Sequence, residues 1–293
     1  MPRKILEEKL KQLLAEDIGL GDVTAAAVVP SKLTAEAAVK AKEAGTAAGL
    51  EEAAVLAESL GLNATAEVAD GEDFRKGQVI LKLSGDARTI LSAERTILNL
   101  ISRMSGIATT AKRLTEKLRK AHAKTKIAAT RKTAPGLLYF DKKAVLIGGG
   151  DPHRLSLSDM VLVKDNHIAL AGSIKNAVKN AKRNASFSKK IEVEVVRVTD
   201  VLKAAEAGAD IIMLDNFSPT QIKEAIRVLK KAGFFGRILL EASGGITASN
   251  LLDYAATQVD IISLGELTHS VRALDVSLEI TRVDNKGKTA KRQ

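Results

Sequence analysis

Polar and chargeable side chains follow short apolar runs throughout the second half of the sequence. The run "MVLV" is followed directly by Lys164, Asp165, Asn166 and His167. The runs "IAAT", "IIML" and "IISLG" also end in charged or hydrogen-bonding residues. Parallel barrels gather the carboxyl ends of their strands on one rim, and active sites lie there. The pattern therefore predicts that side chains far apart in the sequence converge on one site.

The expected rim is rich in cations. Its members are Arg131, Lys132, His153, Arg154 and Lys164. So many positive groups would repel one another unless an anionic ligand or neighbouring acids neutralised them. Arginine suits two-point recognition of carboxylate or phosphate, so the implied ligand carries at least two negative groups. The alternative is that acids of nearby loops pair with these cations. The candidate partners are Asp141, Asp151 and Asp159.

Two acids, Glu194 and Asp215, lie on different expected strands. In "IEVEV" the glutamates alternate with branched apolar residues, so both share one face, which would point into a barrel. Glu194 and Asp215 can serve general acid–base chemistry or hold Mg²⁺, whose shell is completed by water and substrate phosphates. The alternative is that the two carboxylates pair with barrel lysines such as Lys164.

The segments "EASGGIT" and "SLGELTHS" join glycines and small hydroxyl residues to expected helix starts. Backbone N–H groups at such turns bind phosphate, and the ends of the last two barrel strands form a recurrent phosphate site. The alternative is a pair of tight turns with N-caps from Ser243 or Thr247. The loop "IGGGDPH" does not match GxGxxG and predicts no dinucleotide site.

Two regions with different patterns of expected helices and strands position these residues. The first mixes an amphipathic helix over residues 5–14, a helix in "LEEAAVLAESLGL" and strand-like runs in "TAEAAVKA" and "GQVILKLSGDART". The segment "SAERTILNLISRMSGIATTAKRLTEKLRKA" predicts one long helix or a broken pair. From residue 124 onward, short apolar runs alternate with helix-length segments. This alternation predicts parallel βα units in a closed or nearly closed barrel.

The composition excludes several classes of site. The 293 residues include no cysteine, which excludes disulfides, zinc–thiolate sites and cysteine nucleophiles. We expect a cytoplasmic protein without a membrane partner, because no apolar run reaches ~18 residues and the N-terminus lacks the apolar core of a signal peptide. The net charge of +10 is compatible with nucleic-acid binding, but aromatic residues make up only 3%. Bases stack on such residues, so we expect no nucleic-acid partner and interpret the charge as a solvated basic surface.

In their order along the chain, the motifs resemble the quinolinate phosphoribosyltransferase family, the carboxylating nicotinate-nucleotide pyrophosphorylases. The matching segments cover most of the chain and include "EDIGLGDVT", "AERTILNLISRMSGIAT", "TRKTAPGL", "AVLIGGGDPHR", "LVKDNHI", "IEVEV", "GADIIMLDNF", "EASGGIT" and "LGELTHSVRALDVSLEI". The resemblance implies an α/β fold. Residues 1–107 would form an N-terminal α/β sandwich domain, joined by the segment 271–293, and residues 108–270 an incomplete, TIM-like α/β barrel.

The resemblance also implies a reaction. Quinolinate and 5-phosphoribosyl 1-pyrophosphate would give nicotinate mononucleotide, CO₂ and pyrophosphate, with Mg²⁺ as cofactor. The expected catalytic residues are Lys132, Lys164, Glu194 and Asp215. The residues expected to bind or flank the quinolinate carboxylates are Arg95, Thr130, Arg131, His153, Arg154 and Lys164. Glu194 and Asp215 would face the ribose and hold Mg²⁺ largely through substrate and water. The residues expected at the phosphate end are Ser243, Gly244, Gly245, Gly265 and His269.

A shared site is a further implication of the resemblance. In a homodimer, the first domain of one subunit would close the barrel site of the other, and Arg95 would reach the neighbour's quinolinate. Whether dimers assemble further stays open at this point.

One departure and three rival functions remain. The family usually has arginine after "PGL", where this chain has Leu138. This difference puts the carboxylate and phosphate contacts at that edge in question. The nearest rival is a sibling phosphoribosyltransferase acting on nicotinate, which needs fewer cations. A molybdenum-associated relative of the same fold is disfavoured by Lys164 and Asp165. A basic nucleic-acid-binding barrel is the rival from another class, and the low aromatic content disfavours it.

Overall fold

The computed structural model describes residues 1–284, which fall into two compact units. One unit comprises Met1–Thr109 with the described part of the segment that begins at Val271, and the other comprises Thr110–Ser270. Helix α4 (Ala87–Lys120) contributes residues to both. The segment expected as one helix or a broken pair is therefore one continuous helix. The domain boundaries expected from the resemblance stay predictions.

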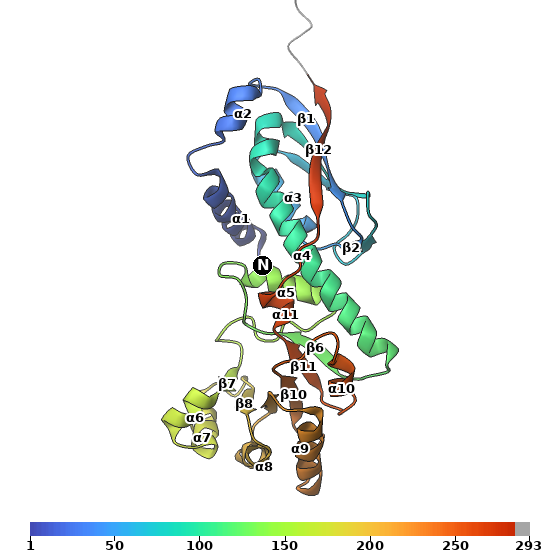
Figure 1. Cartoon of the computed structure of the whole chain (residues 1–293). Coiled ribbons are helices and arrows are strands. Elements are labelled where there is room, and N and C mark those ends of the chain that lie inside the picture. The colour runs from blue at the N-terminus through green and yellow to red at the C-terminus, as the bar shows by residue number, and fades with distance from the viewer. Residues whose placement is uncertain (285–293) are drawn as a thin grey trace, which may run out of the picture. The chain divides into compact units, whose positions relative to one another are not determined.

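The first unit is built on an antiparallel sheet with the strand order β12-β1-β5-β3. Its strands are β1 (Thr34–Ala41), β3 (Asn63–Ala66), β5 (Val79–Asp86) and β12 (Val276–Asp284). Strand β12, from the far end of the described chain, lies beside β1 (Figure 1). The other elements are the helices α1 (Arg3–Ile18), α2 (Val23–Val28) and α3 (Leu50–Ser59) and the short strands β2 (Gly45–Thr46) and β4 (Asp73–Phe74).

The return of the chain to the first unit depends on a close approach to α4. A Cβ atom added at Gly106 would lie 2.1 Å from the carbonyl oxygen of Arg272, so only glycine allows this packing. Nearby, the backbone N–H of Leu274 donates to the carbonyl of Ser102 at 3.0 Å. The segment that leads into β12 is thus fixed to α4 before it pairs with β1.

The second unit contains a six-stranded sheet with the order β6-β11-β10-β9-β8-β7. Its strands are β6 (Lys126–Ala129), β7 (Val161–Val163), β8 (Ile191–Val195), β9 (Ile211–Asp215), β10 (Leu239–Ser243) and β11 (Ile261–Leu264). All of its neighbouring pairs are parallel. The helices of this unit are α5 (Leu138–Ile147), α6 (Asp165–Ala171), α7 (Ile174–Asn184), α8 (Val198–Ala207), α9 (Pro219–Lys231), α10 (Leu251–Ala255) and α11 (Glu266–His269). The predicted parallel βα architecture is confirmed.

The ring of strands is open between β6 and β7, since no ladder joins these two strands within residues 1–284. Asp151 extends the β6 side by one residue. Its N–H donates to the carbonyl of Ile127, and its carbonyl accepts from the N–H of Ala129, both at 2.9 Å. The barrel is therefore incomplete, and the residues that follow Asp151 lie beside the end of β6.

The register of the parallel strands separates two faces. Glu194 is in register with Met213, Met213 with Glu241, and Asp215 with Ser243. Residues in register project to the same side of a sheet, so these side chains share the inner face. The residues between them, such as Val193, Ile212 and Leu240, are buried. Because alternate residues project to opposite faces, these apolar side chains lie on the helix-covered side.

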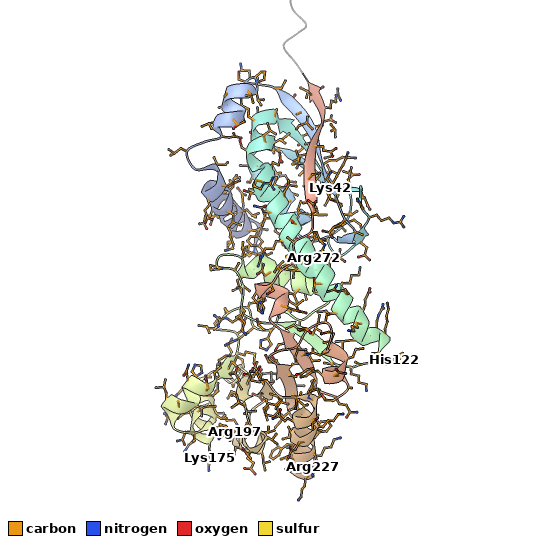
Figure 2. All side chains as sticks on the ribbon, viewed as in Figure 1. Lys42, His122, Lys175, Arg197, Arg227 and Arg272 are labelled. Carbon is orange, nitrogen blue, oxygen red and sulfur yellow. The ribbon has the colours of Figure 1, made fainter. Side chains whose placement is uncertain are left out.

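The basic side chains are spread over exposed positions. Lys175 of α7, Arg197 before α8 and Arg227 of α9 extend outward from their elements (Figure 2). The side chains of Arg197 and Arg227 are 71% and 80% exposed. This distribution agrees with the expected solvated basic surface. In the described part of the chain, no helix has the length and apolar character needed to cross a membrane.

Lys142 of α5 is an exception, because its side chain is only 1% exposed. Its Nζ donates to the carbonyl of Pro152, in the loop that follows Asp151. Burial lowers the pKa of Lys142 to about 8. The charge of Asp151 opposes this shift, and the charges of Arg131 and Arg154 add to it. Because burial disfavours the charged ammonium group, protonated Lys142 lowers the stability of the folded state.

We predict that the stability of the protein depends on pH through Lys142. Its folded pKa lies below the unfolded value, so the unfolded state binds more protons between pH 8 and pH 10.5. The free energy of unfolding of the parent, relative to that of Lys142→Met, should therefore rise by about 2 kcal/mol between pH 7 and pH 10. Urea unfolding of both proteins at the two pH values measures this difference. A constant difference would show that Lys142 titrates as an ordinary exposed lysine.

Candidate active site

A cavity of about 510 Å³ opens within the second unit at the carboxyl ends of its parallel strands. Most of the residues singled out in the sequence line it. They are Thr130, Arg131, Lys132, His153, Arg154, Lys164, Glu194, Asp215, Ser243, Gly244 and Gly245. They come from six strand ends and loops spread over more than a hundred residues. The predicted convergence at one rim is therefore present in the structure.

Gly265 and His269 lie next to this cavity. A Cβ atom added at Gly265 would lie 2.7 Å from the imidazole of His269 and 3.7 Å from Cδ of Lys132. The His269 ring thus covers Gly265 on the side of Lys132. Arg95 belongs to the first unit, where it lines a separate cavity of about 270 Å³ with Ser102 and the residues around Leu274.

An ion pair joins two of the predicted catalytic residues. Nζ of Lys164 lies 2.6 Å from Oε2 of Glu194, and the two side chains are 43% and 12% exposed. Lys164 follows β7 directly and precedes α6, and its N–H donates to Nδ1 of His167 at 3.0 Å. The exposed fractions of the two side chains place Lys164 at the mouth of the cavity and Glu194 deeper inside. In this structure Glu194 is therefore paired with a barrel lysine, as the alternative interpretation of the sequence had it.

Two arginines of the cavity, Arg131 and Arg154, lie close enough for their charges to interact. Burial lowers the pKa of Arg154, and the positive charge of Arg131 lowers it further. Two of the acids expected as partners instead accept backbone hydrogen bonds within their own loops. Asp151 accepts from the N–H of His153 at 2.7 Å, and Asp159 accepts from the N–H of Ser156 at 3.0 Å. These two carboxylates are therefore engaged by the backbone of their own loops.

The ends of β9 and β10 are joined by Asn216, which sequence reasoning did not select. Its N–H donates to the carbonyl of Ser243, and its Nδ2 donates to Oδ2 of Asp215, both at 2.8 Å. A Cβ atom at Gly244, where φ is +89°, would lie 2.3 Å from Oδ1 of Asn216. Glycine is therefore required there, and the Asp215 carboxylate is oriented by its neighbour.

The N-caps considered as the alternative after β10 are not formed. Helix α10 begins only at Leu251, after Asn250, and neither Ser243 nor Thr247 caps it. Instead, the N–H of Thr247 donates to the side chain of Asn250 at 2.8 Å. The glycines Gly244 and Gly245, both with positive φ, form a turn that opens into the cavity and does not lead directly into a helix.

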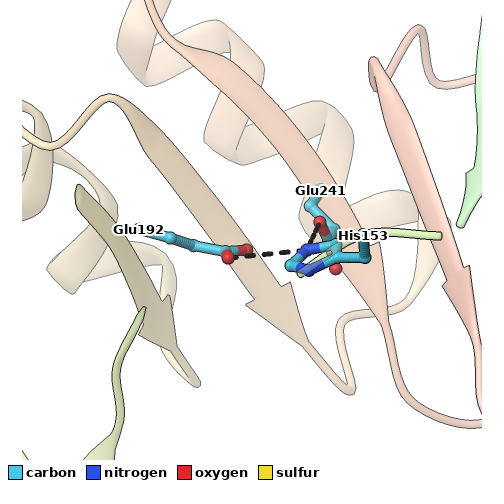
Figure 3. A group of neighbouring side chains, drawn as sticks. All are labelled: His153, Glu192 and Glu241. Carbon is cyan, nitrogen blue, oxygen red and sulfur yellow. Dashed lines mark hydrogen bonds and ion pairs between the residues drawn. The ribbon is translucent and has the colours of Figure 1, made fainter. Parts of the chain in front are cut away.

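A buried cluster below the rim was also missed. Glu192 of β8 and Glu241 of β10 are 0% exposed, and both face the imidazole of His153 (Figure 3). Nε2 of His153 lies 3.1 Å from Glu241 and 3.6 Å from Glu192. The signal was present in "IEVEV", where the period of two places Glu192 on the same face as Glu194. The sequence held no comparable signal that Glu241 and His153 meet there.

The electrostatics of this cluster follow from its burial. Burial raises the pKa of Glu192 to about 8, and the charge of Glu241 adds to this effect. Glu192 is therefore largely a neutral acid at pH 7. Burial opposes protonation of His153, but the hydrogen bond with Glu241 and the charges of both glutamates outweigh it and raise the pKa of His153. With Glu192 protonated, the cluster carries at most one negative charge, on Glu241, beneath the cationic rim.

Comparisons with known proteins agree with this site and fold. Residues 107–279 match the family model "Quinolinate phosphoribosyl transferase, C-terminal domain", and residues 22–105 match "Quinolinate phosphoribosyl transferase, N-terminal domain". Together the two matches span nearly the whole chain.

Individual relatives are similar over most of their lengths. A probable carboxylating nicotinate-nucleotide pyrophosphorylase of Methanocaldococcus jannaschii is 45% identical over 277 residues, covering 93% of this chain and 96% of that protein. One from Archaeoglobus fulgidus is 46% identical over 260 residues, covering 89% of this chain and 98% of that protein. The crystal structure of NadC from Streptococcus pyogenes superposes with a TM-score of 0.86 at 36% identity, covering 95% of this chain and 97% of that one. The chain belongs to the quinolinate phosphoribosyl transferase family.

Proposed function

We infer that the chain is a carboxylating nicotinate-nucleotide pyrophosphorylase. It joins quinolinate to 5-phosphoribosyl 1-pyrophosphate and yields nicotinate mononucleotide, CO₂ and pyrophosphate, a step of NAD biosynthesis. The observation that carries this conclusion is the single cavity in which Arg131, Arg154 and Lys164 face the acids Glu194 and Asp215. A dicarboxylate and a phosphorylated sugar are the two kinds of ligand that such a divided site suits.

The cationic side of the cavity is proposed to bind the two carboxylates of quinolinate. Arg131, Arg154 and Lys164 make the main contacts, and Lys132, His153 and Thr130 lie beside them. The mutual repulsion between Arg131 and Arg154 supports this assignment, because a bound dianion relieves it. Lys164 is proposed to loosen its ion pair with Glu194 and to bind a carboxylate of quinolinate. Leu138 carries no charge at the position after "PGL" where the family usually has arginine.

The acidic side is proposed to face the ribose. Departure of pyrophosphate leaves an electron-poor ribosyl centre, which Glu194 and Asp215 stabilise electrostatically. The pyridine nitrogen attacks this centre and becomes cationic. It then accepts the electron pair left when the adjacent carboxylate departs as CO₂. No protein nucleophile is required, so positioning and fixed charges carry the catalysis.

The phosphate end is proposed to lie against the turn after β10. Ser243, Gly244 and Gly245 line the cavity there, and Gly265 and His269 lie beside Lys132. Mg²⁺ is the proposed cofactor, and it supplies charge neutralisation for the pyrophosphate. The donor set fits an ion held largely through water and substrate, because one oxygen of Glu194 is paired with Lys164 and one of Asp215 with Asn216.

We propose a homodimer in which Arg95 of the partner subunit reaches this cavity. Support comes from the resemblance and from the position of Arg95 in the first unit. Assembly beyond a dimer stays open, and a cytoplasmic location stays a prediction.

The activity itself is tested with purified protein, quinolinate, phosphoribosyl pyrophosphate and Mg²⁺. We expect release of CO₂ and formation of nicotinate mononucleotide, and no product when nicotinate replaces quinolinate. Chromatography of the product and trapping of labelled CO₂ measure both. Product from nicotinate but none from quinolinate would move the assignment to the sibling transferase.

Lys164→Ala should leave the fold intact and lower kcat/KM for quinolinate by about 100-fold or more, because it removes a cation from the site and leaves Glu194 unpaired. Circular dichroism checks the fold, and initial rates check the activity. The matched control is Lys223→Ala on the exposed side of α9, which should change the rate little. Near-normal turnover by Lys164→Ala would count against this site.

A mixed dimer tests the shared site. Arg95→Ala and Lys164→Ala should each be nearly inactive as homodimers. A heterodimer of the two, co-purified through different tags, has one intact site and should recover about half of the parent activity. Without exchange of Arg95 between subunits, both sites of the heterodimer carry one defect. Absence of recovery would therefore refute the shared site.

A further inference from the structure

The imidazole of His153 has both nitrogens occupied by contacts within the chain. Nδ1 accepts a hydrogen bond from the backbone N–H of Arg154 at 2.8 Å, and Nε2 lies 3.1 Å from Oε2 of Glu241 (Figure 3). A ring nitrogen that accepts from an N–H carries no hydrogen itself. The hydrogen of this ring is therefore on Nε2, where it is donated to Glu241. The contacts fix one tautomer of His153.

The same argument decides against a metal ion in this cluster. The ligand atoms of His153, Glu192 and Glu241 all lie within 4.8 Å of one another, which is close enough to hold one. Coordination by Nε2 would move the ring hydrogen to Nδ1, where it would face the N–H of Arg154. Ligating histidines instead direct their second nitrogen at an acceptor. The geometry therefore favours a chain of hydrogen bonds from Glu241 through His153 to Arg154.

The backbone around His153 is held in an unusual conformation. His153 has a φ of 52°, in the left-handed region that non-glycine residues rarely adopt. Its N–H is bound by Asp151, and the preceding carbonyl of Pro152 accepts from Lys142. Such a conformation persists only where the surroundings fix it from several sides. The contact with Glu241 connects this loop to β10, across the inner face of the sheet.

These contacts also determine the position of Arg154. Its backbone N–H is the donor that His153 holds, and its side chain lines the cavity beside Arg131. A different tautomer would point an N–H of the ring at the N–H of Arg154, and the loop would have to turn. The guanidinium would then leave its position beside the other cations.

We propose that Glu241 is a positioning residue: it holds His153 as the Nε2–H tautomer, which fixes the backbone at Arg154 and so aims its guanidinium at a carboxylate of quinolinate. This rests on the proposed function. It assigns Glu241 no contact with substrate. His153 acts in this arrangement through Arg154, because neither of its ring nitrogens is free for a ligand.

Kinetics of two Glu241 variants test the proposal. Glu241→Leu removes the acceptor for Nε2–H, and the KM for quinolinate should rise by about 10- to 100-fold. The KM for phosphoribosyl pyrophosphate serves as the internal control and should change by less than about threefold. Glu241→Gln keeps an oxygen acceptor and should restore the KM for quinolinate to near the parent value. Equal changes of both KM values, or no rescue by glutamine, would overturn the proposal.

A spectroscopic readout separates this proposal from the proposed function. The sequence contains four histidines, so ¹⁵N-histidine labelling gives few signals, and His153→Asn identifies the one required. We expect the Nε2–H tautomer in the parent and in Glu241→Gln. In Glu241→Leu, the Nε2–H tautomer should no longer dominate. An Nδ1–H tautomer in the parent, or broadening of this signal by Mn²⁺ without substrate, would overturn the proposal. A parent that shows the Nε2–H tautomer but does not turn over quinolinate would refute the proposed function, and with it the role assigned to Glu241.

Discussion

The parallel register of β8, β9 and β10 is the constraint on which the site depends. It places Glu194, Met213 and Glu241 in one row of the inner face and Asp215 and Ser243 in the next. Because alternate residues of a strand project to opposite sides, a slip of one residue would turn these side chains toward the helices. The apolar residues between them bury the outer face and hold the register. The chemistry of the cavity is thus tied to the packing of the barrel.

Burial of charge is the cost of this arrangement. Glu192, Glu241 and Lys142 are all almost fully buried, and an unpaired charge in such a place is strongly unfavourable. The chain offsets the cost in different ways. Glu192 stays largely protonated, Glu241 pairs with His153, and Lys142 donates to a backbone carbonyl. The contacts of Glu241 and Lys142 also hold the loop that carries Arg154, so these two buried groups help to fix the geometry of the rim.

The ion pair between Lys164 and Glu194 has a different character, because it lies at the mouth of the cavity and Lys164 remains partly exposed. Glu194 is only 12% exposed, so a ligand that takes Lys164 must leave this carboxylate another partner. A dicarboxylate that takes Lys164 frees a carboxylate on the side of the ribose. Binding of quinolinate to Lys164 would in this way make Glu194 available to the ribose of the second substrate.

The sequence by itself determined the family, the parallel βα architecture and most of the residues that line the cavity. It did so because strands in a parallel sheet end on the same side, so a polar residue after an apolar run is informative wherever it lies. Only the tertiary structure decided which of these groups touch. The pair between Lys164 and Glu194, the role of Asn216 beside Gly244, and the meeting of His153 with Glu241 depend on loop conformations and on the register between strands. Those properties arise from packing across segments far apart in the chain, and local patterns of residues do not encode them individually.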